Sequence, residues 1–354
     1  MKKFLSILSL FFLVSFLQLS AKTIYVNAVA SGNNDGSTWT NAYISLQSAL
    51  ASAVSGDEVW VCSGTYKPAA SGGATSAAFY IASGIKLYGH FAGTETATSQ
   101  RQLSNSSYAT ILSGDLNGNS GEFTNMGDNS KNVVVFDHSG SETLLDGFTV
   151  TQANYSGIYV DGHQGAASSP TLRNCLITLN TGVFGAGIFL YGLSSSSTCV
   201  LSIDNCTFHK NRVIDTGRTG AIEAAYNVQL NITNSFFTNN TGGIAGAIWA
   251  DGNCQISNTT FSGNINLGET GTISKHGGTL TISDCSFLNN VANIATPGVA
   301  LFYCTATIIG TTFNGNYSLD PWDTDKGFFD FTPQGGAILN DLGSILTVLS
   351  LIHI

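Results

Sequence analysis

The sequence predicts an all-β protein, a right-handed parallel β-helix with one capping helix at its N-terminal end. Three observations lead to this fold class: a repeat that returns roughly every 26 residues, a composition rich in glycine and poor in charge, and a single amphipathic helical segment near the start. Repeats with periods of about 20 to 50 residues are the signature of solenoids, propellers and arrays. The repeat therefore decides the architecture before any single element is assigned.

The repeat unit reads Ile-x-Asn-Cys-x-Phe-x-x-Asn at residues 203–211 and returns along the chain, after a looser copy at 172–180. Its phenylalanines are Phe208, Phe237, Phe261, Phe287 and Phe313, and its last asparagines are Asn211, Asn240, Asn264, Asn290 and Asn316. Successive phenylalanines are 29, 24, 26 and 26 residues apart, which is too short for a propeller blade of about 40 to 50 residues. Three short strands with their turns fit into one such step, so each step forms one rung of a β-helix.

Stacked rungs bring equivalent residues above one another, at the spacing of about 4.8 Å between neighbouring strands. We therefore expect the phenylalanines to form a ladder in the core and the asparagines to hydrogen-bond from rung to rung at one turn. A second motif, a glycine close before an isoleucine, marks another turn, where a Cβ would clash or the backbone needs a positive φ. Its glycines are Gly187, Gly220, Gly246, Gly271 and Gly336.

Residues 1–21 have the pattern of a secretory signal peptide. Lys2 and Lys3 precede an apolar run from Phe4 to Leu17, and small residues lead up to Ala21. The alternative is an anchoring transmembrane helix, which needs about 20 apolar residues, and this run is shorter. We expect a protein that is secreted or displayed at the cell surface, with no transmembrane span in the mature chain.

Residues 22–348 are expected to form one domain, whose first part, about 22–57, caps the solenoid. A helix from about Ala42 to Val54, with Thr40 or Asn41 as its N-cap, places apolar side chains on one face. An open solenoid end exposes apolar core and unpaired strand edges. A covering helix before the first coil therefore has a clear physical role.

Residues 349–354 have a different predicted origin. The run Leu-Ser-Leu-Ile-His-Ile is what CTG-TCT-CTT-ATA-CAC-ATC encodes, the end sequence of a transposon widely used to build sequencing libraries. We expect the native reading frame to end near Val348 and the chain to be a fragment with a non-native tail.

Composition limits the partners. Only 10% of the residues are charged, glycine numbers 40, and the formal net charge is −9. An acidic chain with few Lys and Arg does not suit nucleic acid or anionic lipid. The partners that remain are an extracellular glycan or a surface protein.

The seven cysteines are expected to be buried thiols and not disulfides. Cys175, Cys206 and Cys285 occupy one position of the repeat, where Ser235 and Thr259 also occur. A position that exchanges Cys for Ser and Thr requires a small side chain. The other cysteines lack the spacing of a zinc site.

Two known families share these features. The Phe-x-x-Asn repeats and the run Gly-Gly-Ala-Ile at 335–338 resemble the repeats of polymorphic outer-membrane adhesins. The N-terminal third is similar to secreted pectin-lyase-like β-helix proteins of the choice-of-anchor type, found in Bacteroidetes-like bacteria. The segments that carry this likeness are 24–27, 34–39, 46–50, 56–61, 64–68, 88–95 and 110–115. The resemblance implies a pectin-lyase-like solenoid that acts as an adhesin-like or structural binding module.

The alternative is a polysaccharide lyase or glycoside hydrolase on the same fold. Such enzymes need acids that hold calcium with a basic residue, or two or three carboxylates close together. Asp204 and Asp284 lie two rungs apart, and no acid cluster is evident beside Arg173, Arg212 or Arg218. We therefore assign no catalytic residue and favour binding over catalysis.

The predicted ligand-binding residues are Phe189, Tyr191, Glu223 and Trp249. In a strand, the residue after an inward isoleucine points outward, so Phe189, Glu223 and Trp249 are expected to share one exposed face. Exposed aromatic residues with a carboxylate suit carbohydrate or protein contact. The alternative is that these are scattered aromatic side chains covered by a loop.

Two acidic loops are candidate calcium sites. Asp115, Asn117 and Asn119 place oxygen side chains on alternate residues, although the loop departs from the EF-hand pattern at Ser120 and Met126. The second loop contains Asp320, Asp323 and Asp325. The alternative is that both loops are solvated turns rich in Asp and Asn. No cofactor other than calcium is expected.

Overall fold

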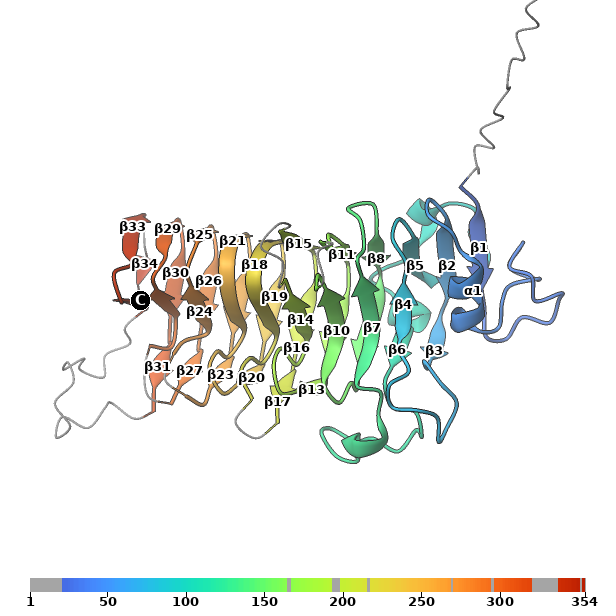
Figure 1. The fold of residues 1–354 in the computed structure, drawn as a ribbon, viewed down its shortest axis with the longest axis horizontal. Coiled ribbons are helices and arrows are strands. Elements are labelled where there is room, and N and C mark those ends of the chain that lie inside the picture. The colour runs from blue at the N-terminus through green and yellow to red at the C-terminus, as the bar shows by residue number, and fades with distance from the viewer. Residues whose placement is uncertain are drawn as a thin grey trace, which may run out of the picture.

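The computed structural model describes residues 21–163, 167–192, 198–214, 217–268, 270–293, 296–319, 337–350 and 352–353. These residues wind into an elongated stack of short strands, with the N-terminal coils at one end and the C-terminal coils at the other (Figure 1). The strand pairings in the described ranges are parallel, including β14 with β18 and β16 with β19. The chain is therefore a parallel β-helix, as the repeat predicts.

Three sheets make up the helix. The large sheet contains β1 (Thr23–Val26), β2 (Glu58–Cys62), β4 (Phe79–Ile81), β5 (Lys86–Phe91), β7 (Asn132–Asp137), β8 (Leu144–Asp146), β10 (Ser156–Asp161), β11 (Thr171–Arg173), β14 (Ile188–Tyr191), β15 (Cys199–Asp204), β18 (Ile222–Thr233), β21 (Ile248–Ser257), β24 (Ile273–His276), β25 (Thr279–Ser283), β28 (Val299–Phe302), β29 (Thr305–Ile309), β32 (Ile338–Asp341) and β33 (Ile345–Leu349). The second sheet contains β3 (Gly64–Tyr66), β6 (Thr110–Ser113), β9 (Phe148–Thr151), β12 (Leu176–Thr178), β16 (Thr207–His209), β19 (Phe236–Thr238), β22 (Thr260–Ser262), β26 (Ser286–Leu288), β30 (Thr312–Asn314) and β34 (Ile352–His353). The third contains β13 (Thr181–Gly182), β17 (Arg212–Val213), β20 (Thr241–Gly242), β23 (Ile265–Asn266), β27 (Val291–Ala292) and β31 (Tyr317–Ser318).

Each full rung visits the large sheet twice and each smaller sheet once. In β18 and β21 the two visits to the large sheet merge into one long strand. All but two of the ten described strands of the second sheet follow Leu144, which agrees with the roughly eight coils that a period of about 26 residues predicts for that region.

The core holds the repeated side chains. Ring centroids of successive phenylalanines from Phe208 to Phe313 lie 4.5, 4.9, 4.7 and 4.6 Å apart, with the rings stacked. At the adjacent turn each asparagine amide donates to the next, as Asn240 Nδ2 does to Asn264 Oδ1 at 2.9 Å. The seven cysteines are free and buried, which confirms the prediction of buried thiols.

The sequence leaves two reasons for the turn glycines, a steric clash of a Cβ or a positive φ. The structure supports the steric reason. A Cβ on Gly220 would lie 2.3 Å from the carbonyl oxygen of Gly246, and one on Gly187 would lie 2.7 Å from that of Ala221. Neither glycine has a positive φ. Close approach of the next rung, and not backbone handedness, requires glycine at these positions.

The capping helix is present but shorter than predicted. It is α1 (Leu46–Ser52), with Ser45 as its N-cap, and it buries Leu46, Ala49 and Leu50 in the core at the N-terminal end (Figure 1). The start at Ala42 was wrong because Tyr43 pairs with Val26 as an isolated parallel bridge, which keeps its backbone extended. Three short 3-10 helices lie in loops: η1 (Thr98–Gln100), η2 (Ser106–Tyr108) and η3 (Met126–Asp128).

The two predicted end segments, 1–21 and 349–354, lie only partly within the described residues. Residues 1–20 lie outside the described part, so the signal peptide stays a prediction. Near the other end, β34 pairs with β30 and continues the second sheet; the non-native origin of 349–354 also stays a prediction. None of the helices in the described ranges has the length and apolar character needed to cross a bilayer.

Candidate functional site

One row of outward side chains on the large sheet carries the predicted ligand-binding residues. Tyr159, Phe189, Glu223 and Trp249 pair in register across β10, β14, β18 and β21. Their preceding isoleucines, such as Ile222, are buried in the core, so strand alternation turns the row outward. The structure thus brings Phe189, Glu223 and Trp249 onto one face, and Tyr191 lies two residues further along β14.

This row is not exposed, which corrects the sequence-based expectation. The exposed fraction is 7% for Phe189, 9% for Trp249 and zero for Glu223. The turn before each strand accounts for the burial. Phe184 and Arg218 occupy equivalent turn positions, linked through the hydrogen bond from Thr219 N to Phe184 O at 2.9 Å, and their side chains pack over the row.

An open cleft of ≈ 310 Å³ remains between these layers, and we call it the aromatic cleft. It is lined by Tyr155, Tyr159, Phe184, Phe189, Tyr191, Arg218, Glu223, Ala225 and Tyr226. Its rings pack against one another, with Phe184 stacked on Phe189 at 4.9 Å and Tyr226 edge-on to Tyr191 at 5.5 Å. Tyr226 is 48% exposed, so the cleft opens to solvent beside it.

A second group of rings extends the face toward the C-terminal coils. Trp249 lies 5.2 Å from His276, which stacks on Phe302 at 4.7 Å between ring centroids. Aromatic side chains therefore lie on both sides of Glu223 along the helix axis.

Arg218 connects Glu223 to Trp249. Its Nη1 lies 2.7 Å from Oε1 of Glu223, and its guanidinium carbon lies 4.3 Å from the centroid of the Trp249 ring. Among the described residues, Arg218 thus has a single acid beside it, a pairing that the sequence analysis did not single out. The two residues meet because the turn carrying Arg218 folds back over the strand that carries Glu223.

Glu223 is an unsatisfied buried acid. Neither carboxyl oxygen has a hydrogen-bond partner among the described residues, and the Oγ1 atom of Thr219 also lacks one. Burial raises the pKa of Glu223 to about 7, while the charge of Arg218 and the hydroxyl of Thr219 act in the opposite direction. Such a carboxyl can accept hydrogen bonds from a ligand or exchange a proton near neutral pH.

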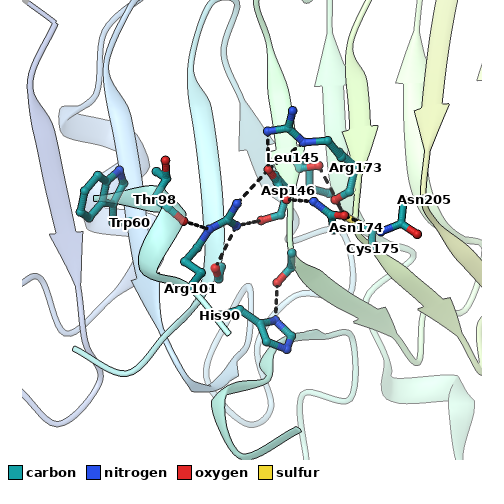
Figure 2. Close-up of polar contacts among 12 residues, drawn as sticks. Trp60, His90, Thr98, Arg101, Leu145, Asp146, Arg173, Asn174, Cys175 and Asn205 are labelled. Atoms are coloured by element: carbon teal, nitrogen blue, oxygen red, sulfur yellow. Dashed lines mark hydrogen bonds and ion pairs between the residues drawn. The ribbon is translucent and has the colours of Figure 1, made fainter. Parts of the chain in front are cut away.

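A second buried acid, Asp146, is fully occupied by protein donors (Figure 2). Its Oδ2 accepts from Arg101 Nη2 at 3.0 Å and from Arg173 Nη2 at 2.6 Å, and its Oδ1 accepts from Asn174 Nδ2 at 2.7 Å. These hydrogen bonds raise the pKa of Arg173. Arg173 therefore has one acid partner, which the sequence analysis did not identify, and no oxygen of Asp146 is left for a ligand.

The position of Arg101 indicates that this cluster has a structural role. It comes from the connection between β5 and β6, and its guanidinium carbon lies 5.1 Å from the Tyr88 ring centroid. The cluster fastens that connection to the outer face of the large sheet. Glu223, in contrast, has only the ion pair with Arg218 and keeps acceptor capacity for a ligand, so we take the aromatic cleft as the candidate site.

Polar side chains of the first predicted calcium loop are hydrogen-bonded to protein groups, and the Oδ1 of Asn117 accepts from Ser71 Oγ and Gly72 N outside the loop. Asp115 accepts backbone N–H groups from Gly118, Asn119 and Ser120, and Asn117 and Asn119 donate to Asp128. The part of the chain that the structure describes holds no group of three or more His, Cys, Asp or Glu side chains arranged for a metal ion. Calcium at this loop stays a prediction, and Asp320, Asp323 and Asp325 lie outside the described residues.

Several cleft residues were not singled out from the sequence. Phe184 and Arg218 each stand five residues before an outward residue of the row, Phe189 and Glu223 respectively. Aligning the rungs on the outward position, and not only on the inward phenylalanine, would have revealed this second repeat position. Tyr226 follows no such period.

Comparisons with known proteins find only weak similarity. No known family model matches the chain. The chain is 28% identical over 199 residues to metabotropic glutamate receptor-like protein R of Dictyostelium discoideum; the match covers 53% of this chain but only 12% of that protein.

Two solved structures match the chain weakly. Pectate lyase Pel9A gives a TM-score of 0.49 at 15% identity, covering 95% of this chain and 77% of that one. Alginate lyase from Paenibacillus sp. gives 0.43 at 18% identity, covering 84% and 98%. With both scores below 0.5, the assignment of the fold rests on the strand pairing of the chain itself.

Proposed function

We propose that this protein is a secreted or cell-surface β-helix module that binds glycan through the aromatic cleft. The observation that carries the proposal is a cleft of stacked rings with a buried carboxyl in its wall whose only close polar partner among the described residues is Arg218. Sugar rings have apolar C–H faces that pack on aromatic rings, while their hydroxyls need hydrogen-bond partners. The aromatic cleft offers both.

The scaffold favours a preformed site. The phenylalanine and asparagine ladders fix successive rungs against one another, so the aromatic rings on the outer face need little ordering when a ligand binds. Binding by a preorganised surface loses less conformational entropy. A long, stiff surface of this kind suits an adhesin-like role, as the resemblance to polymorphic adhesins and choice-of-anchor proteins implies.

Binding through the cleft is tested with its most accessible rings. We expect Tyr226→Ala and Tyr191→Ala to weaken binding to any glycan found on an array by at least tenfold in calorimetry. Tyr317→Ala, an exposed tyrosine on β31 of the third sheet, is the matched control. Unchanged affinity in both cleft variants would overturn the proposal.

Cleavage of a polysaccharide in the same cleft is the second candidate. It is favoured by Glu223, because a carboxyl with a pKa near neutral and an oxygen without a hydrogen-bond partner among the described residues can serve as a proton acceptor. Arg218 lies beside it and could neutralise charge on a substrate. Ultraviolet absorbance of an unsaturated product from polyuronides tests the lyase version, and its absence at high protein concentration would leave binding as the function.

A further inference from the structure

The charges around the aromatic cleft are mostly negative. Arg218 is the one cation among the residues that line the cleft, and Glu223 already pairs with it at 2.7 Å. Two further acids border the face: Asp161 pairs in register with Tyr191, and Asp251 with His276. No unpaired positive charge among these residues faces an arriving ligand.

Two nearby basic groups do not change this balance. Lys275 lies on the adjacent strand, but its side chain is buried and its Nζ donates to the carbonyls of Gly252, His276 and Gly277. Burial lowers the pKa of His276, against the charge of Asp251, so its ring is neutral at pH 7. The net charge of −9 for the whole chain adds to the local field.

A polyuronate carries a carboxylate on every sugar, and these carboxylates would face Glu223, Asp161 and Asp251. Like charges brought together in a partly desolvated cleft repel strongly. Recognition of such a polymer needs exposed basic side chains or a bound cation. Among the described residues that line the cleft, the basic side chain is Arg218, and it is already paired with Glu223.

The unsatisfied atoms point to a ligand with hydrogen-bond donors. Oε2 of Glu223 is buried without a partner among the described residues, and Oε1 has only the ion pair with Arg218, a condition that costs stability unless a ligand or water supplies donors. Adjacent sugar hydroxyls can donate to both oxygens of one carboxylate. A site built to accept hydrogen bonds rejects a ligand that lacks the donors.

We infer that the aromatic cleft selects neutral glycans over polyuronates and that Glu223 is the specificity-determining group. This inference rests on the proposed glycan-binding function. Arg218, whose side chain is 31% exposed, moves aside from Glu223 when a sugar binds, and the rings on either side pack against the sugar faces. Glu223 then contributes hydrogen-bond acceptors to neutral sugars and repulsion to acidic ones.

Calorimetry with matched hexasaccharides tests the selectivity. The neutral probes are cellohexaose, laminarihexaose and mannohexaose, and the acidic probes are hexagalacturonate and hexamannuronate, at pH 8 in low salt. We expect the best neutral probe to bind at least tenfold more tightly than either uronate. Tighter binding of a uronate would overturn the inference while leaving the proposed function intact, and binding of neither class would overturn both.

Two sets of variants test the role of the acids. Glu223→Gln keeps the shape of the side chain and removes its charge, so we expect the neutral-to-uronate affinity ratio to fall about tenfold. Glu142→Gln, an exposed acid in the turn after β7, should leave the ratio unchanged. Asp161→Asn with Asp251→Asn should lower the ratio in the same direction, and this double variant decides the matter if Glu223→Gln does not fold. An unchanged or higher ratio in the folded variants would show that these acids do not set specificity.

Discussion

Arg218 and Glu223, five residues apart in the chain, form a close ion pair on the outer face of the large sheet, with Arg218 Nη1 2.7 Å from Glu223 Oε1. The pair sits between two groups of aromatic rings and beside an open cleft. Its acid is fully buried but has no hydrogen-bond partner. Asp146, another buried acid, is saturated with hydrogen-bond donors, whereas Glu223 has only Arg218 beside it among the described residues, and this asymmetry marks the site.

Glu223 should make stability depend on pH near neutrality. Its pKa in the folded chain is raised from 4.5 to about 7, so the folded state holds a proton that the unfolded state releases. The stability from this group is therefore fully present below pH 4.5 and is lost as pH rises through 7, by about 3 kcal/mol in total. Glu223→Gln should remove this slope.

Urea unfolding at pH 4.5, 6 and 8 measures the effect as the difference between wild type and Glu223→Gln. Taking the difference cancels the titration of other groups. Glu142→Gln should keep the slope of the wild type. If the unfolding free energies of wild type and Glu223→Gln change with pH in parallel, the carboxyl is not desolvated in the folded chain.

Phe236 and Phe237 are adjacent but face opposite sides of β19, and they should respond very differently to substitution. Phe237 is fully buried in the ladder, with its ring 4.5 Å from that of Phe208, whereas Phe236 is 48% exposed. We expect Phe237→Ala to cost about 3 to 5 kcal/mol of unfolding free energy because it leaves a cavity between stacked rings. Phe236→Ala should change it by no more than about 0.5 kcal/mol. Similar midpoints for the two variants would contradict the ladder.

The repeat predicts the ladder because it fixes inward and outward positions at the same time. Once Phe237 is placed inside, alternation places its neighbour outside, and the isoleucine before Glu223 places that acid on the outer face. These relations depend only on sequence spacing within a strand. They hold in the structure at Phe189, Glu223 and Trp249.

Burial of that outer row could not be read from the same spacing. It depends on how the turn containing Arg218 folds over the strand, and the alternation of side chains within a strand does not specify that fold. Arg101 reaches Asp146 across 45 residues through a connection that occurs in a single rung. The helix start was missed for a related reason, because Tyr43 is held extended by its pairing with Val26. Contacts made by unique loops lie beyond what a repeat predicts.

Substitution of an asparagine at the centre of the ladder should lower the unfolding free energy strongly. Asn264 donates from Nδ2 to Phe237 O at 2.8 Å and to Asn290 Oδ1 at 2.9 Å, and it accepts from Asn240 Nδ2 at 2.9 Å. Asn264→Ala would leave these buried groups unpaired, at about 1 to 3 kcal/mol each. We expect a loss of at least about 3 kcal/mol by chemical unfolding. Asn314→Ala, an exposed position on β30, is the control, and an equal effect at both sites would refute a special role for the ladder.

Asp146 should hold the β5–β6 connection in place. It is fully buried, and it pairs with Arg101, whose side chain is only 6% exposed. Asp146→Ala would leave a buried guanidinium without its anion, which typically costs about 3 to 5 kcal/mol. The loss should be local first, because Arg101 is the main polar link between this connection and the large sheet, so trypsin should cut after Arg101 much faster in the variant. Asp204→Ala removes a partly exposed acid that accepts from Thr233 and Asn234 and should leave that cleavage rate unchanged. If trypsin cuts wild type and Asp146→Ala at the same rate, the connection is held by the packing of Tyr88 and Phe91 alone and the ion pair does not fasten it.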